Sequence, residues 1–213
     1  SHRIIDCRWA RLGFLGYFHD GFADRISGIF INRLDPAKII EDVGRLKKDC
    51  DAVIVSLHWG MEKVSFPSPD QIKIARGMID AGADIILGHH PHVLQGIERY
   101  KHGLIAYSLG NFQFQPDNDP LGHPAAARTD ESIVLTTKIA RGGAISFETY
   151  AVQIGDDCIP APADDPAGIN NYLARLSRSI EDDLITPSAW MEQAAPIYIS
   201  DSVKSWKKRI RSY

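Results

Sequence analysis

Two histidines separated by a proline, His90-Pro91-His92, have the type and spacing of metal ligands. Proline excludes helix at this point and restricts the residue before it to an extended conformation. Residues two apart in an extended chain point the same way, so we expect both imidazoles to face one ion. His89 is then expected to face elsewhere, where it could support a ligand or contact substrate.

A third histidine, His58, follows an apolar segment and could supply another nitrogen ligand to the same centre. Glu62 comes four residues later and could orient a ligand, bind substrate or transfer protons, with a plain surface carboxylate as the equal alternative. Asn111 could ligate a metal through its carbonyl oxygen or hold a substrate oxygen, with an ordinary Gly-Asn turn as its alternative. A lone histidine is usually a packed or surface residue, so the hypothesis requires that His58, His90 and His92 converge.

We therefore expect His58, His90 and His92 to bind metal, and His58, His89, Glu62 and Asn111 to take part in catalysis. Trp59 and Phe112 could wall the pocket, although packing is the default for aromatic residues. The remaining four histidines are interpreted as ordinary packed or surface residues: His2, His19, His102 and His123.

The elements before these residues predict where they meet. Apolar segments at 10–18, 51–57 and 84–87 are typical of buried strands, and helical spacing with end signals predicts helices at 36–48 and 69–81. A strand, a helix and a strand in this order form a right-handed crossover with parallel strands, whose carboxyl ends share one sheet edge. Ligand sites of open α/β sheets usually lie at such an edge.

Downstream segments predict two hairpins and a tail. Residues 93–100 and 104–109 read as a hairpin that returns Asn111 to the same edge, and 132–140 with 144–154 read as a second one. Residues 113–128 have the composition of an irregular loop. We expect a domain at 1–158, then a tail at 159–213 made of a linker at 160–168 and helical or irregular segments.

Composition narrows the functional classes. The 213 residues contain 44% hydrophobic side chains, enough for one good-sized core, and a net charge of −3 predicts no nucleic-acid surface. Three widely spaced cysteines favour neither a disulfide framework nor a CxxC zinc site. No apolar run approaches the roughly 20 residues of a membrane helix. We expect the visible chain to be soluble, either extracellular through an anchor outside this sequence or cytoplasmic.

Four motifs carry a family resemblance over roughly residues 12–114. VSLHWGME, the proline and glutamine of PSPDQ, AGADIILGHHPHVLQGIE and IAYSLGNFQF resemble, in order, the motifs of the CapA, or poly-γ-glutamate biosynthesis, family. The resemblance implies an α/β fold of the calcineurin-like metallophosphoesterase type, a four-layer αββα sandwich with mixed sheets. It places His90 and His92 in a His-x-His metal motif and His58 in the single-histidine motif before it.

Two motifs of that family do not precede His58 here. They are an aspartate-bearing Gly-Asp motif and an Asn-Asn-His motif, which supply the bridging carboxylate and much of the first metal site. This sequence is accordingly expected to be the C-terminal half of the domain, with a natural remnant as the alternative.

The resemblance implies a metal-dependent hydrolase of capsule or poly-γ-glutamate biosynthesis, active when the N-terminal half is present. A complete site would hold two divalent ions about 4 Å apart, drawn from Mn, Zn, Fe or Mg, and would attack a phosphoester or an amide of a small or polymeric substrate. The alternative function is a non-catalytic accessory or scaffold module of a membrane-bound capsule synthesis and export complex.

Overall fold

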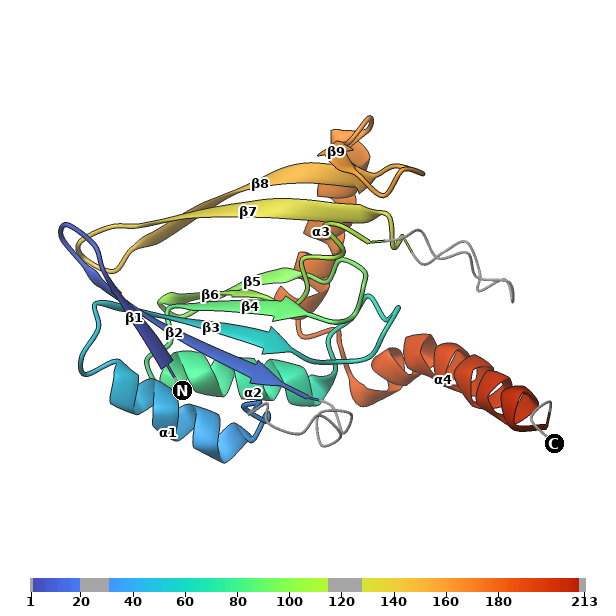
Figure 1. Ribbon diagram of the computed structural model, residues 1–213, viewed down its shortest axis with the longest axis horizontal. Coiled ribbons are helices and arrows are strands. Elements are labelled where there is room, and N and C mark those ends of the chain that lie inside the picture. Colours follow the sequence, from blue (N-terminus) through green and yellow to red (C-terminus); the bar gives the residue numbers. More distant parts are fainter. Residues whose placement is uncertain (1, 20–30, 115–127, 211–213) are drawn as a thin grey trace.

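The structure is a computed structural model that describes residues 2–19, 31–114 and 128–210. In this part of the chain a mixed sheet lies between two helices and a second, antiparallel sheet (Figure 1). The mixed α/β class expected from the sequence is confirmed. No helix among these residues combines the length and apolarity that a membrane crossing requires.

The mixed sheet has the order β1-β2-β3-β4-β6-β5. Its strands are β1 (His2–Asp6), β2 (Arg11–Phe18), β3 (Ala52–His58), β4 (Ile85–His89), β5 (Ile97–Tyr100) and β6 (Gly103–Ala106). β2, β3, β4 and β6 are parallel, as the crossover argument predicts, and β5 pairs antiparallel with β6 as the expected hairpin. β1, which the sequence did not predict, pairs antiparallel with β2 at the edge.

One face of the mixed sheet packs on α1 (Pro36–Leu46) and α2 (Pro69–Asp80). Both helices begin where the sequence predicts, because Asp35 and Ser68 accept hydrogen bonds from backbone amides of the first turn. Alternation along the strands turns Val55 and Ile86 toward these helices and Ile54 and Ile85 toward the second sheet. The sheet is thus buried on both faces.

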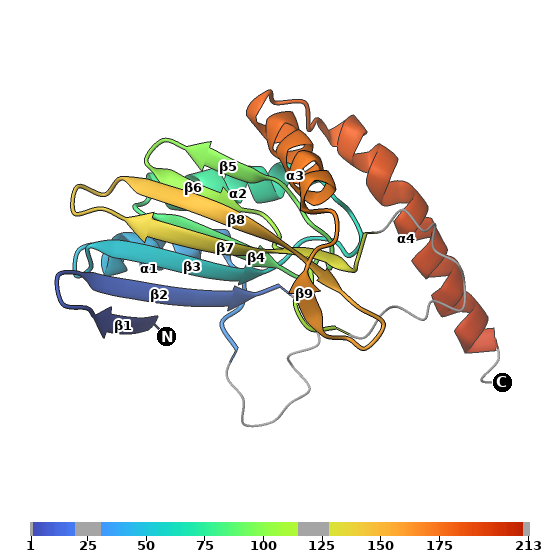
Figure 2. The same cartoon turned by 90° about the horizontal axis from the view of Figure 1, so that it is seen from above.

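The second sheet consists of β7 (Glu131–Ile139), β8 (Ile145–Ile154) and β9 (Pro160–Pro162), all antiparallel. β7 and β8 form the expected hairpin. Seen from above, they lie over the mixed sheet, and α4 (Pro187–Ile210) extends away from both (Figure 2).

The segment 160–168 is expected to be a linker, but the structure has regular elements there. It contains β9, which pairs with β8, and the first residues of α3 (Pro166–Glu181). Apolar residues of α3 at helical spacing, Ile169, Leu173 and Leu176, belong to the core between the sheets, so packing outweighs the proline-rich composition. The domain boundary after residue 158 stays a prediction.

Candidate metal centre

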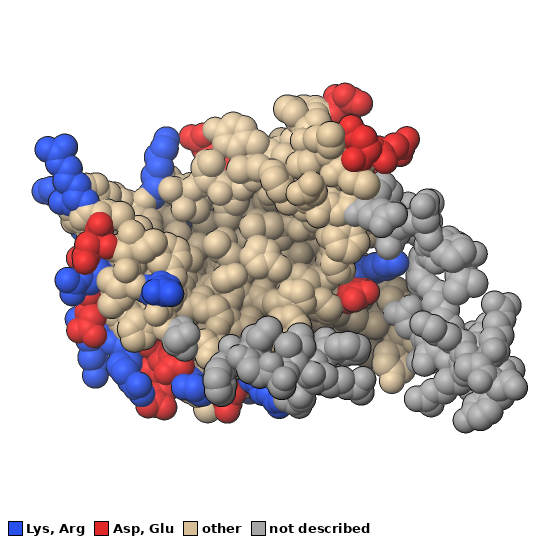
Figure 3. Space-filling view, in the orientation of Figure 1, with Lys and Arg blue, Asp and Glu red and all other residues tan. Residues whose placement is uncertain are grey.

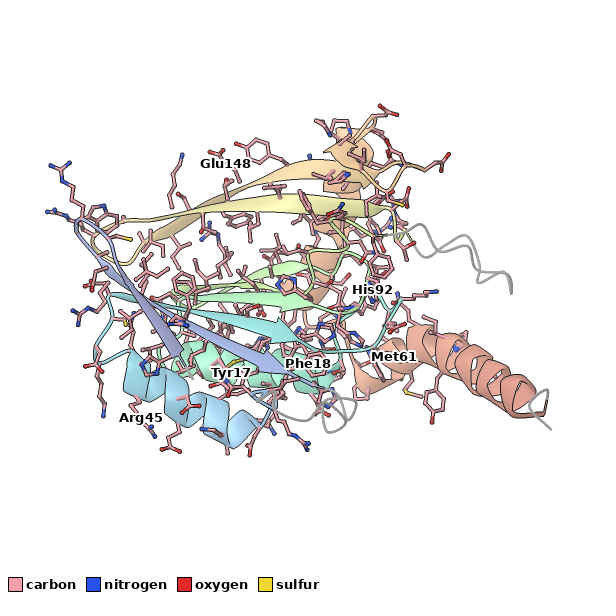
Figure 4. All side chains as sticks on the ribbon, viewed as in Figure 1. Tyr17, Phe18, Arg45, Met61, His92 and Glu148 are labelled. Atoms are coloured by element: carbon pink, nitrogen blue, oxygen red, sulfur yellow. The ribbon has the colours of Figure 1, made fainter. Side chains whose placement is uncertain are left out.

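The candidate residues meet at the carboxyl-terminal edge of the mixed sheet. Phe18, His58 and His89 are the last residues of β2, β3 and β4, and they stand opposite one another in the parallel register. Figure 4 shows Phe18, Met61 and His92 at this end of the sheet. The structure therefore brings the histidines together at the sheet edge that the crossover predicts.

The three expected metal ligands lie side by side. The ring centroids of His58 and His90 are 4.5 Å apart, and those of His90 and His92 are 6.0 Å apart. Phe18 stacks on the far side of His58, with centroids 4.5 Å apart. The sequence analysis did not single out Phe18, although its place at the end of the neighbouring strand was available as a signal.

Glu62 lies close to His90 and His92, the two histidines that flank Pro91. The potential ligand atoms of Glu62, His90 and His92 all lie within 4.8 Å of one another, and the Glu62 carboxylate is exposed at the rim. His58 falls outside this group of three and contacts it through His90. The carboxylate thus lies where it could serve as a ligand, a role that the sequence left undecided.

The backbone that brings His90 and His92 together is not the extended one that the proline predicted. Both residues have positive φ, +102° for His90 and +60° for His92, so that expectation is wrong. The loop must turn here, because Leu94 pairs antiparallel with Leu109 directly afterward. Positive φ at a non-glycine residue costs about 1–3 kcal/mol and is found mostly at functional sites.

Backbone hydrogen bonds join the loops after β3 and β4. The Trp59 amide donates to the His89 carbonyl at 2.9 Å, and the Lys63 amide donates to the Pro91 carbonyl at 2.7 Å. These bonds hold the loop that carries Glu62 against the loop that carries His90 and His92.

Trp59 is a buried packing residue at the base of the site. Only 1% of it is exposed, it stacks with Tyr107, and its Nε1 donates to the Tyr107 carbonyl at 3.1 Å. Gly88 lies between them, where a Cβ atom would come within 1.8 Å of the Tyr107 carbonyl oxygen. Phe112, the other expected wall residue, is 56% exposed.

Asn111 returns to the edge as the hairpin predicted and contacts His92. Its Nδ2 donates to the Thr129 carbonyl at 2.9 Å, which turns Oδ1 toward Nδ1 of His92 at 2.8 Å. An amide oxygen only accepts, so His92 must carry its proton on Nδ1. Nε2 then keeps the lone pair that a metal needs.

His89 lies beside His58 on the wall of a second cavity, of about 430 Å³, lined by the ends of β2, β3 and β4 and by residues 31–32. Burial lowers the pKa of His89 and favours its neutral form. Of the other histidines, His2 and His102 are exposed, His19 lines a separate cavity, and His123 lies outside the described residues.

The donor set fits a divalent metal ion. Two imidazole nitrogens and one carboxylate oxygen are ligands of Zn²⁺ and of other first-row ions, and His58 and Asn111 stand next to them. The set does not select one metal.

Comparison with known proteins agrees with the motifs. The family described as bacterial capsule synthesis protein PGA_cap matches residues 7–116. The PGA biosynthesis protein CapA of Bacillus subtilis (strain 168) is 39% identical over 153 residues, covering 72% of this chain and 38% of the relative. The capsule biosynthesis protein CapA of Bacillus anthracis is 43% identical over 149 residues, covering 68% and 34%.

A more distant relative is a probable polyglutamine synthesis accessory protein of Mycobacterium tuberculosis, 27% identical over 168 residues, covering 75% of this chain and 43% of that protein. The chain thus spans 34–43% of the length of these three relatives.

Proposed function

Because the chain belongs to the bacterial capsule synthesis protein family PGA_cap, we propose that it carries the histidine part of the metal centre of a hydrolase in capsule polymer or poly-γ-glutamate biosynthesis. The observation that carries this proposal is the group Glu62, His90 and His92, whose ligand atoms lie within 4.8 Å of one another, with His58 in ring contact. Structural packing alone does not require three such side chains at the end of a sheet.

The chain's own residues would divide the work. His90, His92 and Glu62 bind the ion and His58 supports it or binds a second one, while Asn111 holds Nε2 of His92 in its unprotonated state. Neutral His89 is placed to accept or deliver a proton in the adjoining cavity. A bound divalent ion would polarise a phosphoryl or acyl oxygen and would lower the pKa of a water molecule toward neutral pH.

Two ions are proposed for the complete site, from Mn, Zn, Fe or Mg. The second ion would need ligands beyond these four residues. On the face shown in Figure 3, many Lys and Arg side chains lie at the end of the sheet opposite the histidines, and a basic group also lies beside an acidic one at the histidine end. The proposed contact for an anionic substrate is the metal itself. Phosphoester cleavage is the favoured reaction, with amide cleavage in the polymer as its rival.

The second candidate function is a non-catalytic accessory module of a membrane-bound polymer synthesis complex. It is favoured by the word accessory in the name of the Mycobacterium tuberculosis relative. In that role the histidines would be structural.

Metal binding and hydrolysis separate the two candidates. An enzyme binds Mn²⁺ or Zn²⁺ in a calorimetric titration and hydrolyses an aryl phosphate when joined to the rest of its polypeptide. His90→Ala abolishes both, whereas the matched control His102→Ala, at an exposed position, changes neither. Wild-type protein that binds no metal and releases no product would reject the hydrolase and leave the accessory role.

A further inference from the structure

A cavity lies beside the candidate metal centre, and its lining includes none of the candidate metal ligands. It measures about 680 Å³, within the range of small-molecule sites. Trp59, Gly60 and Met61, the residues between His58 and Glu62, are part of its lining. His19 and the N-terminus of α2 complete the polar part of its lining.

The rest of the wall is apolar and comes from both ends of the chain. α4 begins against it, where Trp190 Nε1 donates to the Phe66 carbonyl at 3.2 Å. The main apolar side chains are Leu34, Trp59, Met61, Ile74, Trp190 and Met191.

One buried polar group on the wall has an unused donor. Gln71 is 6% exposed, and its Oε1 accepts from the Ser68 amide at 2.9 Å in a capping box at the start of α2. That bond fixes the amide orientation, so Nε2 is the free end, and among the described residues it has no hydrogen-bond partner. A buried donor without an acceptor costs free energy, which a ligand oxygen would recover.

Gly60 lets the backbone pass close to this amide. A Cβ atom at this position would lie 2.7 Å from Gln71 Nε2, and the φ of +90° suits glycine. A side chain at this position would therefore clash with the buried donor.

The charges of the lining select the ligand class. Asp70 lies at the rim, and neither lysine nor arginine is found among the described residues that line the cavity. A carboxylate or phosphate would meet no lysine or arginine among those residues. A neutral carbonyl oxygen on an apolar group satisfies both the Nε2 donor and the apolar walls.

We propose that this cavity is a binding site for a neutral, largely apolar amide, ester or ketone whose carbonyl oxygen accepts a hydrogen bond from Gln71 Nε2. The site is separate from the metal centre and does not depend on the proposed hydrolysis. Its ligand class also excludes the polyanionic glutamate polymer from this cavity.

The test uses acetanilide as the probe and N-ethylaniline, which lacks the carbonyl, as its match. Both are titrated into the ¹⁵N-labelled chain with EDTA present, so that failure here is independent of metal binding. Acetanilide should shift the Gln71 side-chain amide and the Trp190 indole signals. Gln71→Glu keeps an acceptor for the capping box but removes the donor, and should weaken acetanilide binding about tenfold while leaving N-ethylaniline unchanged.

Two further variants keep the test decisive. Gln193→Glu makes the same charge change on α4 outside the cavity lining and should bind acetanilide as the wild type does. Ile74→Phe fills part of the cavity and keeps the Gln71 amide, and it should abolish the shifts. This variant tests the proposal if Gln71→Glu does not fold. An unshifted Gln71 amide in the wild type, or equal acetanilide affinity in Gln71→Glu and wild type, would overturn the proposal.

Discussion

His92 and Asn111 are joined side chain to side chain, with His92 Nδ1 2.8 Å from Asn111 Oδ1, although they come from different loops. The Asn111 amide is itself fixed by its bond to the Thr129 carbonyl. Three segments of the chain thus determine which nitrogen of His92 is available to a metal.

Asn111→Ala should weaken divalent metal binding by about 10–100-fold, the usual effect of losing a group that orients a ligand. The alanine frees the His92 ring to rotate and to move its proton. A competition titration with a chromophoric chelator measures the affinity. Gln113→Ala, at an exposed neighbouring position, is the control. Equal affinities in the three proteins would show that Asn111 does not position His92.

Glu62→Gln distinguishes a metal ligand from a surface carboxylate. Loss of the negative charge should reduce metal affinity by at least about 10–100-fold, the usual effect of losing a residue that orients a ligand. The stability of the metal-free chain should stay unchanged because Glu62 is exposed. Glu192→Gln, an exposed carboxylate on α4, should bind metal like the wild type. If both variants retain full affinity, Glu62 is only a surface residue.

Gly88→Ala should destabilise the fold by about 3 kcal/mol, the upper end of overpacking effects. The added Cβ would lie 1.8 Å from the Tyr107 carbonyl oxygen and 2.6 Å from Trp59 Nε1, so β4 or its neighbours must shift. Urea unfolding followed by circular dichroism gives the change. In Gly142→Ala nothing lies within 4 Å of the new Cβ, and stability should stay within about 0.5 kcal/mol of wild type. Equal midpoints for both variants would contradict this account.

Asp42 should make stability depend on pH. Burial alone would raise its pKa, but hydrogen bonds from Lys38 and Tyr17 outweigh burial and lower it. The folded chain then binds this proton less readily than the unfolded chain, whose aspartates titrate near about 3.9. The stabilisation is present above that value and is lost as the pH falls through the lower, folded pKa.

The difference in unfolding free energy between wild type and Asp42→Asn should accordingly be constant above about pH 5 and shrink as the pH falls from there to about 2, through and below the usual aspartate pKa of about 3.9. Urea titrations at several pH values measure it. A difference that stays constant over this range would refute the role of Asp42.

The sequence predicted most of the elements that carry the site because their signals are local. End signals mark the helices expected at 36–48 and 69–81, and the apolar runs before His58 and His89 mark buried parallel strands. Parallel pairing then required the histidines to share an edge, so their meeting followed from topology and not from any measured distance.

What the sequence could not predict depends on contacts between distant segments. The turned backbone of His90 and His92 reflects the pairing of Leu94 with Leu109, which outweighs the local preference before proline. β9 forms because β8 offers it a partner. The proposed role of Gln71 could not be predicted either. In the sequence Gln71 can be explained as part of a helix cap, and only the folded chain places it in the lining of a cavity.

The two backbone bonds from Trp59 to His89 and from Lys63 to Pro91 tie the loops after β3 and β4 together on either side of Glu62. The candidate ligands are therefore preorganised, because their loops are fixed to each other when the protein folds. An ion that binds there would find these side chains already in place, so binding should be fast and should leave the global shape of the described domain unaltered.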